Sequence, residues 1–369
     1  MELIVILLIE GALAAAEWFI YGRFSLKNIE YSVRFNTDEA FEGDTIEIVE
    51  EITNRKWLPV PWVKTELSTS RWLEFIGSKA ARASDARFVP SVFALRPYQK
   101  CTRTRKAVAL KRGVYTLESS SIIAGDIFGL VQASGKMNIN LKIRILPAPY
   151  EVGEGELSSR ELYGEIMTRR FICSDPFYRS GAREYTGNEP INRIHWSSTA
   201  RQGKLMTYNN DFTTENRVLI LINLQRSPLG EPTAPVISDT ETMIKAAAFL
   251  LELCAQTKTA ADLAVNGSGG IFAHGGSGSE DYMKLLRCLA ELENTCDTVF
   301  EDFFERLDIS RYTDIVLITP YLDERIYAIL SRSRRGGANA VVYCNTDEFS
   351  QELQLKPLGR IHKYIFIND

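Results

Sequence analysis

The chain has 369 residues, of which 45% are hydrophobic and 24% are charged, and its formal net charge is -4. This length and apolar content exclude a mainly disordered protein and leave room for two domains that each bury a core. The mildly acidic balance argues against a general nucleic-acid binder, which needs a basic excess over a domain or over one face. We therefore expect no nucleic-acid partner.

The first element that the sequence predicts is an apolar helix at the N-terminus. Residues Leu3–Tyr21 are apolar apart from Glu10 and Glu17, and about 20 such residues cross a bilayer as a helix. Arg23 and Lys27 follow the run, and by the positive-inside tendency they place the rest of the chain in the cytoplasm. The sequence thus predicts a single-pass anchor in the cell membrane, with membrane lipid as its partner. A first buried helix of a soluble fold is the alternative, because Glu10 is costly inside a bilayer.

Residues 28–148 alternate apolar and polar side chains with a period of two, and glycine and asparagine mark the turns. This pattern predicts an antiparallel β-sandwich. Pro59 and Pro61 remove two backbone donors, so their stretch is expected at an edge or a bulge rather than in a central strand. We expect Trp57 and Trp62, beside these prolines, to fill the core.

A polar and glycine-rich connector follows the sandwich and leads into an arginine-rich segment, after which the pattern changes. Residues 216–224 contain a continuous apolar run that is typical of a parallel strand buried on both faces. Helix and strand patterns then alternate to the C-terminus, which predicts an open α/β sheet with helices on both faces. The domain boundaries that these changes indicate are 1–27, 28–148, 149–210 and 211–369.

Ligands of an open α/β sheet gather at the carboxyl ends of its strands. Asn223, Gln225 and Ser227 follow the first apolar strand, in the places where von Willebrand factor A domains, which the alternation resembles, carry D-x-S-x-S and hold a divalent cation. Because a hard cation prefers a carboxylate and Asn223 has none, this site is degenerate and we expect no metal. The glycine-rich loop His274–Glu280 lacks the spacing of a phosphate-binding motif, so no cofactor is expected either.

The stretch Ser180–Met206 concentrates arginines, a histidine and aromatic side chains. It predicts a short helix capped by Asn192, with Ile194, Trp196 and Ala200 available for packing. Guanidinium groups stay charged when partly buried and present five donors, so they clamp carboxylates or backbone carbonyls.

Three interpretations of this stretch are open. It is a structural clasp across the α/β sheet, whose arginines pair with acids such as Asp211 or Glu215. It is a docking surface for an acidic partner. In the third interpretation the protein is a hydrolase or transferase in which His195 acts with Arg193 and Arg201 on an anionic substrate.

The same stretch is similar to a motif of the bacterial family called domain of unknown function 58, R-x-Y-x-x-G-D-x-x-R-x-I-x-W-x-x-S-A-R-x-x-x-L. The matching or neighbouring residues here are Arg183, Tyr185, Gly187, Arg193, Ile194, Trp196, Ala200, Arg201 and Leu205. Asn188 replaces the family's Asp, and Thr199 replaces its Ser. Two further family-like pieces lie upstream, at Lys111–Leu117 and Gly125–Val131.

The resemblance implies a membrane-anchored protein with a β-sandwich, a C-terminal von Willebrand factor A-like domain and no established enzyme activity. It implies a MoxR-type AAA+ ATPase and a transglutaminase-like membrane protein as partners, in a cell-envelope or stress-related assembly. Most such proteins begin with two membrane spans, whereas one is visible here. We therefore expect a non-enzymatic adaptor, and its expected motif or partner-binding residues are Arg183, Tyr185, Gly187, Arg193, His195, Trp196 and Arg201.

Overall fold

The computed structural model describes two compact units of the chain. One comprises Met1–Ala148 together with Leu286–Leu292, and the other comprises Pro149–Leu285 together with Glu293–Asp369. The described residues are 2–77, 81–83, 86–126, 129, 131–149, 179–185, 194–210, 217–228, 237–335, 339–344 and 362–363.

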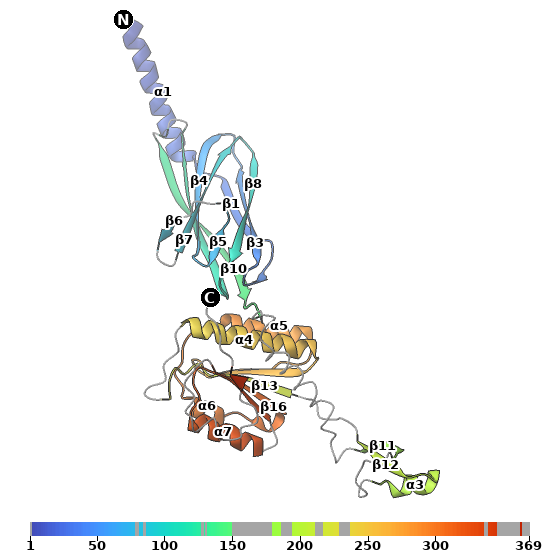
Figure 1. Ribbon diagram of the computed structural model, residues 1–369. Coiled ribbons are helices and arrows are strands. Elements are labelled where there is room, and N and C mark those ends of the chain that lie inside the picture. The colour runs from blue at the N-terminus through green and yellow to red at the C-terminus, as the bar shows by residue number, and fades with distance from the viewer. Residues whose placement is uncertain are drawn as a thin grey trace. The chain divides into compact units, whose positions relative to one another are not determined.

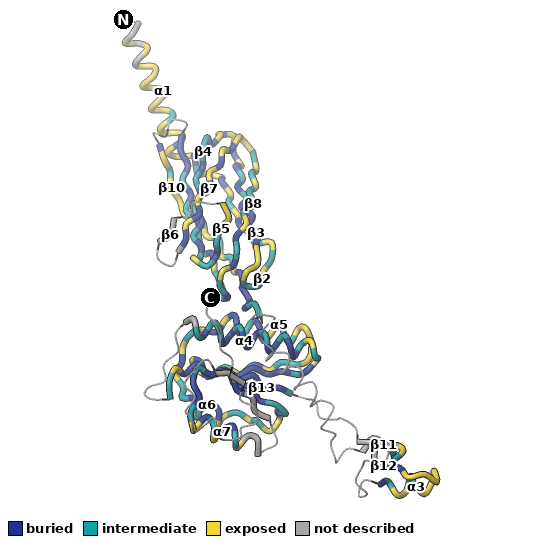
Figure 2. Tube along the Cα trace, viewed as in Figure 1, coloured by how far each residue is buried: buried dark blue, intermediate teal, exposed yellow. Residues whose placement is uncertain are grey.

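The first unit begins with α1 (Glu2–Phe24), whose described residues are exposed over most of the helix (Figure 2). Ile9 is 55% exposed, Leu13 65% and Trp18 64%, whereas Tyr21 near the C-terminal end is buried. Among the residues that the structure describes, no helix has the length and the apolar content that a bilayer crossing needs.

The predicted β-sandwich is confirmed, and it follows α1 in the chain (Figure 1). One sheet has the order β1-β3-β8-β5, with bounds Ile29–Phe35, Thr45–Asn54, Lys100–Ala109 and Leu73–Phe75. The other has the order β2-β10-β9-β4-β7-β6, with bounds Glu39–Phe41, Gln132–Leu146, Gly113–Gly125, Val60–Ser70, Ala86–Leu95 and Ala81–Ala83. The described pairings are antiparallel except that of β10 with β2.

The core of the sandwich forms where the inward positions of the two sheets meet. Ile46 and Ile48 of β3 cluster with Leu67 of β4 and Val89 of β7, and all four are at most 1% exposed. Burying each such side chain contributes roughly 1.5–3 kcal/mol. The alternation that predicted the sandwich is therefore the alternation that builds its core.

Two expectations for the proline-rich stretch differ from the structure. The prediction that Trp57 fills the core is wrong, because its side chain lies in the turn before β4 and is 69% exposed. Trp62 is half-buried, and its indole Nε1 donates to the backbone oxygen of Asp126 over 2.8 Å. β4 is an interior strand rather than an edge, and the register shift expected near Pro61 lies between Val60 and Val63.

The second unit contains a sheet in the order β15-β14-β13-β16-β17-β18. Its strands are β13 (Arg217–Ile222), β14 (Ala260–Val265), β15 (Ile271–Ala273), β16 (Asp314–Thr319), β17 (Asn339–Cys344) and β18 (His362–Lys363). The pairings are parallel apart from that of β14 with β15. Residues 218–222 are buried without alternation, because helices cover both faces of a parallel strand of this kind.

The helices of this part of the chain are α4 (Ile237–Gln256), α5 (Ser279–Glu291), α6 (Phe300–Glu305), the short 3-10 helix η2 (Ile309–Arg311) and α7 (Glu324–Arg335). The residues of α5 from Leu286 onward belong to the first unit. α4 lies on one face of the sheet, and α6 and α7 lie on the other (Figure 1). Phe300 and Phe303 of α6 and Ile326 and Leu330 of α7 pack on Leu317 of β16 in one apolar cluster.

A small hairpin precedes this sheet in the chain. β11 (Arg179–Glu184) pairs antiparallel with β12 (Met206–Asn210), and α3 (Trp196–Gln202) lies between them in sequence. The residues of the arginine motif that the structure describes are all in this hairpin.

Candidate functional site

The hairpin brings the two ends of the arginine motif together. Arg183 stands opposite Thr207 in the strand pairing, and the backbone N–H of Tyr185 donates to the backbone oxygen of Leu205 over 2.9 Å. For Arg183 the structure describes the backbone, and Gly187 and Arg193 lie outside the described residues, as do Asp211 and Glu215. The described part of the motif is thus a local structure of one strand pair and one short helix.

His195 has a structural role in this unit, because it caps α3. Its ring Nδ1 accepts the backbone N–H of Ser198 over 3.2 Å and lies 3.0 Å from the Ser197 hydroxyl oxygen. In the neutral ring the proton is therefore on Nε2. The prediction that Asn192 caps the helix is wrong, since the N-cap is His195. A capping residue that satisfies a helical N–H explains a histidine here without a substrate.

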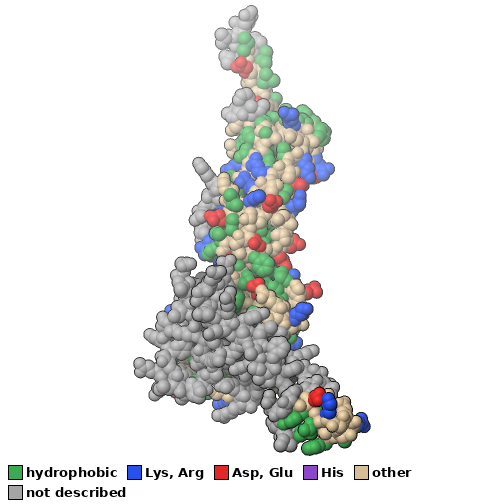
Figure 3. Space-filling model, turned by 45° about the vertical axis from the view of Figure 1, so that its right-hand side comes forward, with side chains coloured by type: hydrophobic (Ala, Val, Ile, Leu, Met, Phe, Trp, Pro, Cys, Tyr) green, Lys and Arg blue, Asp and Glu red, His purple; other side chains and the backbone are tan. Residues whose placement is uncertain are grey.

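The described aromatic and basic side chains of α3 face solvent. Trp196 is 64% exposed, and Ala200 and Arg201 are also exposed. The prediction that Trp196 and Ala200 pack is therefore wrong, whereas Ile194 does pack, at 6% exposure, and bridges Thr207. Figure 3 shows hydrophobic and basic side chains side by side on the surface of this segment. Tryptophan and arginine are both enriched among the residues that carry most of the binding energy at protein interfaces.

At the strand end where the sequence predicted a degenerate cation site, Asn223 is the centre of a hydrogen-bond network. Asn223 is fully buried, and its Oδ1 accepts both the backbone N–H of Gln225, over 2.9 Å, and the side-chain amide of Asn266, over 2.8 Å. Its Nδ2 donates to the Thr319 hydroxyl oxygen over 3.0 Å. Asn266 accepts in turn the backbone N–H of Leu224. Every position at which the Asn223 amide could meet a cation is thus occupied by a hydrogen bond.

Gln225 closes the network toward α6. Its Oε1 accepts the backbone N–H of Phe300 over 2.9 Å, and its Nε2 donates to the backbone oxygen of Ser227 over 2.8 Å. Asp323, in the later strand-end loop, accepts the backbone N–H of Ile326 and so caps α7. Within the described part of the chain, no group of three or more acidic, histidine or cysteine side chains is arranged to hold a metal ion.

A second polar cluster, which the sequence did not indicate, surrounds Asp262 in β14. This carboxylate is fully buried and accepts the Tyr312 hydroxyl over 2.6 Å and the backbone N–H of Gly275 over 3.0 Å. The His274 ring Nδ1 lies 3.2 Å from it and the Arg217 guanidinium 3.8 Å. Burial raises the pKa of Tyr312, and the hydrogen bond to Asp262 raises it further. The cluster joins the glycine-rich loop to β13, β14 and the start of β16.

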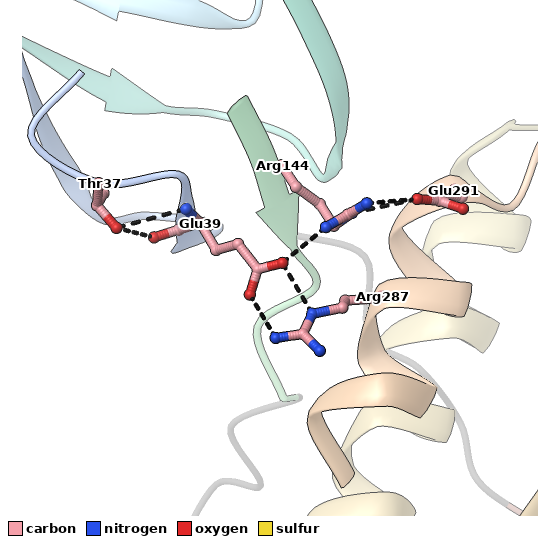
Figure 4. A network of polar contacts seen from close by, with 5 residues as sticks. All are labelled: Thr37, Glu39, Arg144, Arg287 and Glu291. Carbon is pink, nitrogen blue, oxygen red and sulfur yellow. Dashed lines mark hydrogen bonds and ion pairs between the residues drawn. The ribbon is translucent and has the colours of Figure 1, made fainter. Parts of the chain in front are cut away.

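In the first unit, a charged cluster lines an open pocket of about 590 Å³. Glu39 of β2 accepts two hydrogen bonds from Arg287, over 2.8 and 3.0 Å, and one from Arg144 over 2.7 Å (Figure 4). Arg144 also donates to Glu291 over 2.8 Å. These partners, led by the hydrogen bonds from Arg287, hold the pKa of Glu39 below its ordinary value. Since the two acids and two bases pair with one another, the cluster is self-neutralising.

Arg112, from the family-like piece Lys111–Leu117, has a related role. Its guanidinium is buried and donates to the backbone oxygens of Leu289, Ala290 and Leu292, over 2.7, 3.3 and 2.9 Å. These carbonyls lie at the C-terminal end of α5, where the helix leaves acceptors without partners and favours a positive charge. The arginine therefore caps this helix from a turn of the sandwich.

No family model matches the chain, and no curated protein matches it. Among solved structures, it is similar to the CARDB domain of a Pyrococcus furiosus protein, with 12% identity over 32% of this chain and 94% of that one and a TM-score of 0.22. It is also similar to a non-cellulosomal cohesin of Archaeoglobus fulgidus, with 19% identity over 36% and 97% and a TM-score of 0.22. A third similarity is to alpha-2-macroglobulin of Escherichia coli, with 23% identity over 33% of this chain and 17% of that one and a TM-score of 0.25.

Proposed function

We propose that the protein is a membrane-anchored, non-enzymatic adaptor of the domain of unknown function 58 family, and that it binds a MoxR-type AAA+ ATPase through its arginine motif. The observation that carries the proposal is the exposure of Trp196 and Arg201 on α3. A clasp would bury these side chains against its own fold. The docking interpretation needs them at the surface, and their types are those that dominate binding energy at interfaces.

The anchor is supported by α1. Exposed apolar side chains that surround a helix are unfavourable in water and favourable in lipid. Leu3, Val5 and Leu7, whose side chains lie outside the described residues, belong to the same apolar run in the sequence. With Arg23 and Lys27 at the C-terminal end of the run, the anchor leaves the sandwich and the α/β unit in the cytoplasm.

The α/β unit serves in this proposal as a von Willebrand factor A-like binding module that does not use a cation. The amide network of Asn223, Gln225 and Asn266 supports this, because it stabilises the strand-end loops through internal hydrogen bonds. His195 supports a non-enzymatic role, since capping of α3 engages its Nδ1. A partner surface on such a module then depends on exposed side chains rather than on a shared metal ion.

The test is affinity purification of the tagged full-length protein from detergent-solubilised native membranes. A double variant, Trp196→Ala with Arg201→Ala, is compared with wild type and with Arg311→Ala, which removes an arginine of 65% side-chain exposure elsewhere in the same unit. Thermal melts first establish that all three proteins are folded. We expect an AAA+ ATPase to copurify with wild type and with the control and to be lost from the double variant.

Two results would contradict the proposal. If the double variant recovers as much ATPase as wild type, the arginine motif does not bind the ATPase. If no ATPase copurifies with wild type, the proposed partner is wrong. The same purification reports on the second expected partner, a transglutaminase-like membrane protein. A double variant that no longer melts cooperatively would instead favour the structural clasp.

A further inference from the structure

Two exposed aromatic side chains lie on turns of the sandwich that are adjacent to each other. Trp57, in the turn between β3 and β4, is 69% exposed, and Tyr98, in the turn between β7 and β8, is 72% exposed. The backbone N–H of Tyr98 donates to the backbone oxygen of Lys56 over 3.2 Å, so the two turns are in contact. Exposed aromatic pairs are uncommon on a surface that faces only water, because each ring leaves a large apolar area hydrated.

Internal hydrogen bonds hold both turns in place. The buried side chain of Asn54 donates to the backbone oxygens of Leu58 and Arg96, over 2.9 and 3.0 Å, and so joins the two turns. Tyr98 has a φ of 55°, a left-handed conformation that is unfavourable for a bulky residue and persists where the surroundings enforce it. The aromatic rings are therefore presented by a fixed scaffold.

The same turns are attached to the end of α1. Lys56 is buried, and its Nζ donates to the backbone oxygens of Ser25 and Lys27, over 2.6 and 2.7 Å. The Tyr21 hydroxyl donates to the backbone oxygen of Pro59 over 3.3 Å, and Tyr21 packs with Leu58 in a small apolar cluster. Figure 1 shows α1 leaving the sandwich at one end. The position of Trp57 is thus set relative to the point where α1 ends.

Basic side chains surround the aromatic pair. Arg23 and Lys27 are exposed at the end of α1, and Arg55 and Arg96 are exposed two residues before Trp57 and Tyr98. Glu30 offsets part of this charge, since its carboxylate lies 2.6 Å from the Arg55 guanidinium. Tryptophan and tyrosine concentrate at the headgroup level of a membrane, and arginine and lysine near an anionic lipid surface are attracted to it.

From this arrangement we infer that the two turns are a second membrane contact, which rests on anionic phospholipid with Trp57 and Tyr98 in the headgroup region. The inference rests on the proposed anchor, because α1 brings the turns to the bilayer that it enters. The continuity of the turns with α1 favours lipid over a protein partner for this surface. The sandwich then stands with this end on the membrane, and its opposite end, with Leu110, points away.

The test uses the full chain in vesicles of phosphatidylcholine and phosphatidylglycerol, with a benzophenone amino acid placed at single positions. The probe replaces Trp57 or Tyr98, an aromatic for an aromatic on an exposed site. Ile9 in α1 is the position that reports on the anchor. Leu110, which is 42% exposed, is the control at the opposite end of β8, and the ten residues of β8 separate it from the turns by about 30 Å. Irradiation followed by mass spectrometry identifies what each probe has bound.

We expect lipid adducts at Ile9, Trp57 and Tyr98 and none above background at Leu110. Replacing the vesicles by phosphatidylcholine alone should lower the adduct at Trp57 while leaving that at Ile9 unchanged, and the double variant Arg55→Gln, Arg96→Gln should do the same. Adducts at Ile9 without any at Trp57 and Tyr98 would overturn this inference and leave the anchor standing. Absence of adducts at Ile9 would overturn the anchor itself. Protein adducts at Trp57 in place of lipid would assign the turns to a protein partner and refute the membrane contact.

Discussion

Replacing Asn223 by Asp introduces a carboxylate at the first strand end of the α/β sheet, and we expect this change to destabilise the protein. The Asn223 Nδ2 donates to the Thr319 hydroxyl oxygen over 3.0 Å, and the hydroxyl hydrogen of Thr319 is itself donated to the backbone oxygen of Tyr321 over 2.7 Å. An aspartate would point a charged oxygen at an oxygen that has no hydrogen to give. The interaction would change from a hydrogen bond to a repulsion.

The magnitude follows from the burial of this site. Asn223 is fully buried, and a buried polar group that loses its partner costs about 1–3 kcal/mol, and more when it is charged. The second carboxylate oxygen would keep the donors of Gln225 and Asn266, and its charge would strengthen them. We therefore expect the free energy of unfolding to fall by about 2–4 kcal/mol at neutral pH.

Burial should raise the pKa of the introduced carboxyl above that in the unfolded chain. The folded state then binds more protons than the unfolded state, so the stability of Asn223→Asp should fall as pH rises and recover as pH falls toward 4. The assay is urea unfolding followed by circular dichroism, with hydrogen exchange of the β13 amides to assign the transition. It is run in EDTA and in Mg²⁺, at pH 7 and at about pH 5.

The matched control is Asn36→Asp, since Asn36 is exposed and its side-chain oxygen accepts the backbone N–H of Glu47. A carboxylate keeps that hydrogen bond, so the change in stability should stay within about 0.5 kcal/mol. Equal stability of Asn223→Asp and wild type in EDTA would refute the reasoning. Stabilisation of wild type by Mg²⁺ would show that the amide network binds a cation after all.

The remaining predictions concern the first unit. Burial lowers the pKa of Lys56 to about 8 from 10.5. As pH rises, the folded state therefore loses this proton at a lower pH than the unfolded state does. Stability should rise as pH increases from about 8 to 10.5, and a pH series of melts should lose that rise in Lys56→Met. Arg112→Met removes three hydrogen bonds to the end of α5 and should lower the free energy of unfolding by about 2–3 kcal/mol. Arg34→Met, at a side chain that is 65% exposed, should change the free energy of unfolding in urea by at most about 0.5 kcal/mol. A Cβ at Gly125 would overlap the Trp62 ring, so Gly125→Ala should lower the melting temperature through a loss of about 1–3 kcal/mol. Unchanged melts of Arg112→Met or Gly125→Ala would contradict these contacts.

Periodicity predicted the parts of the fold that depend on local side-chain order. The alternation over residues 28–148 predicted the sandwich, because one face of each of its sheets meets the core. The unbroken apolar run of β13 predicted a strand that is covered on both faces. The described hydrogen bonds of Asn223 to Thr319 and Asn266 were not predicted, because they join strand ends that are far apart in the chain.

Helix caps and exposed aromatic residues were predicted less well, because the type of a residue does not determine whether its side chain faces the core or the solvent. Trp57 and Trp196 are both exposed, although large apolar side chains are most often in a core. His195 caps α3 in a place where the spacing favoured Asn192. The exposure of these tryptophans and the identity of the cap depend on the exact residue at which a helix or strand begins. A shift of that residue by one or two positions exchanges buried and exposed side chains.

The sequence by itself determined the order and kind of the elements, because hydrophobic period, proline and glycine act over a few neighbouring residues. The tertiary structure alone decided which distant groups meet. Arg112 caps a helix end at Leu289, 177 residues away in the chain, and Asp262 accepts the hydroxyl of Tyr312, 50 residues away. Such pairs leave no local pattern, because the contact exists only once the chain has brought both partners out of water.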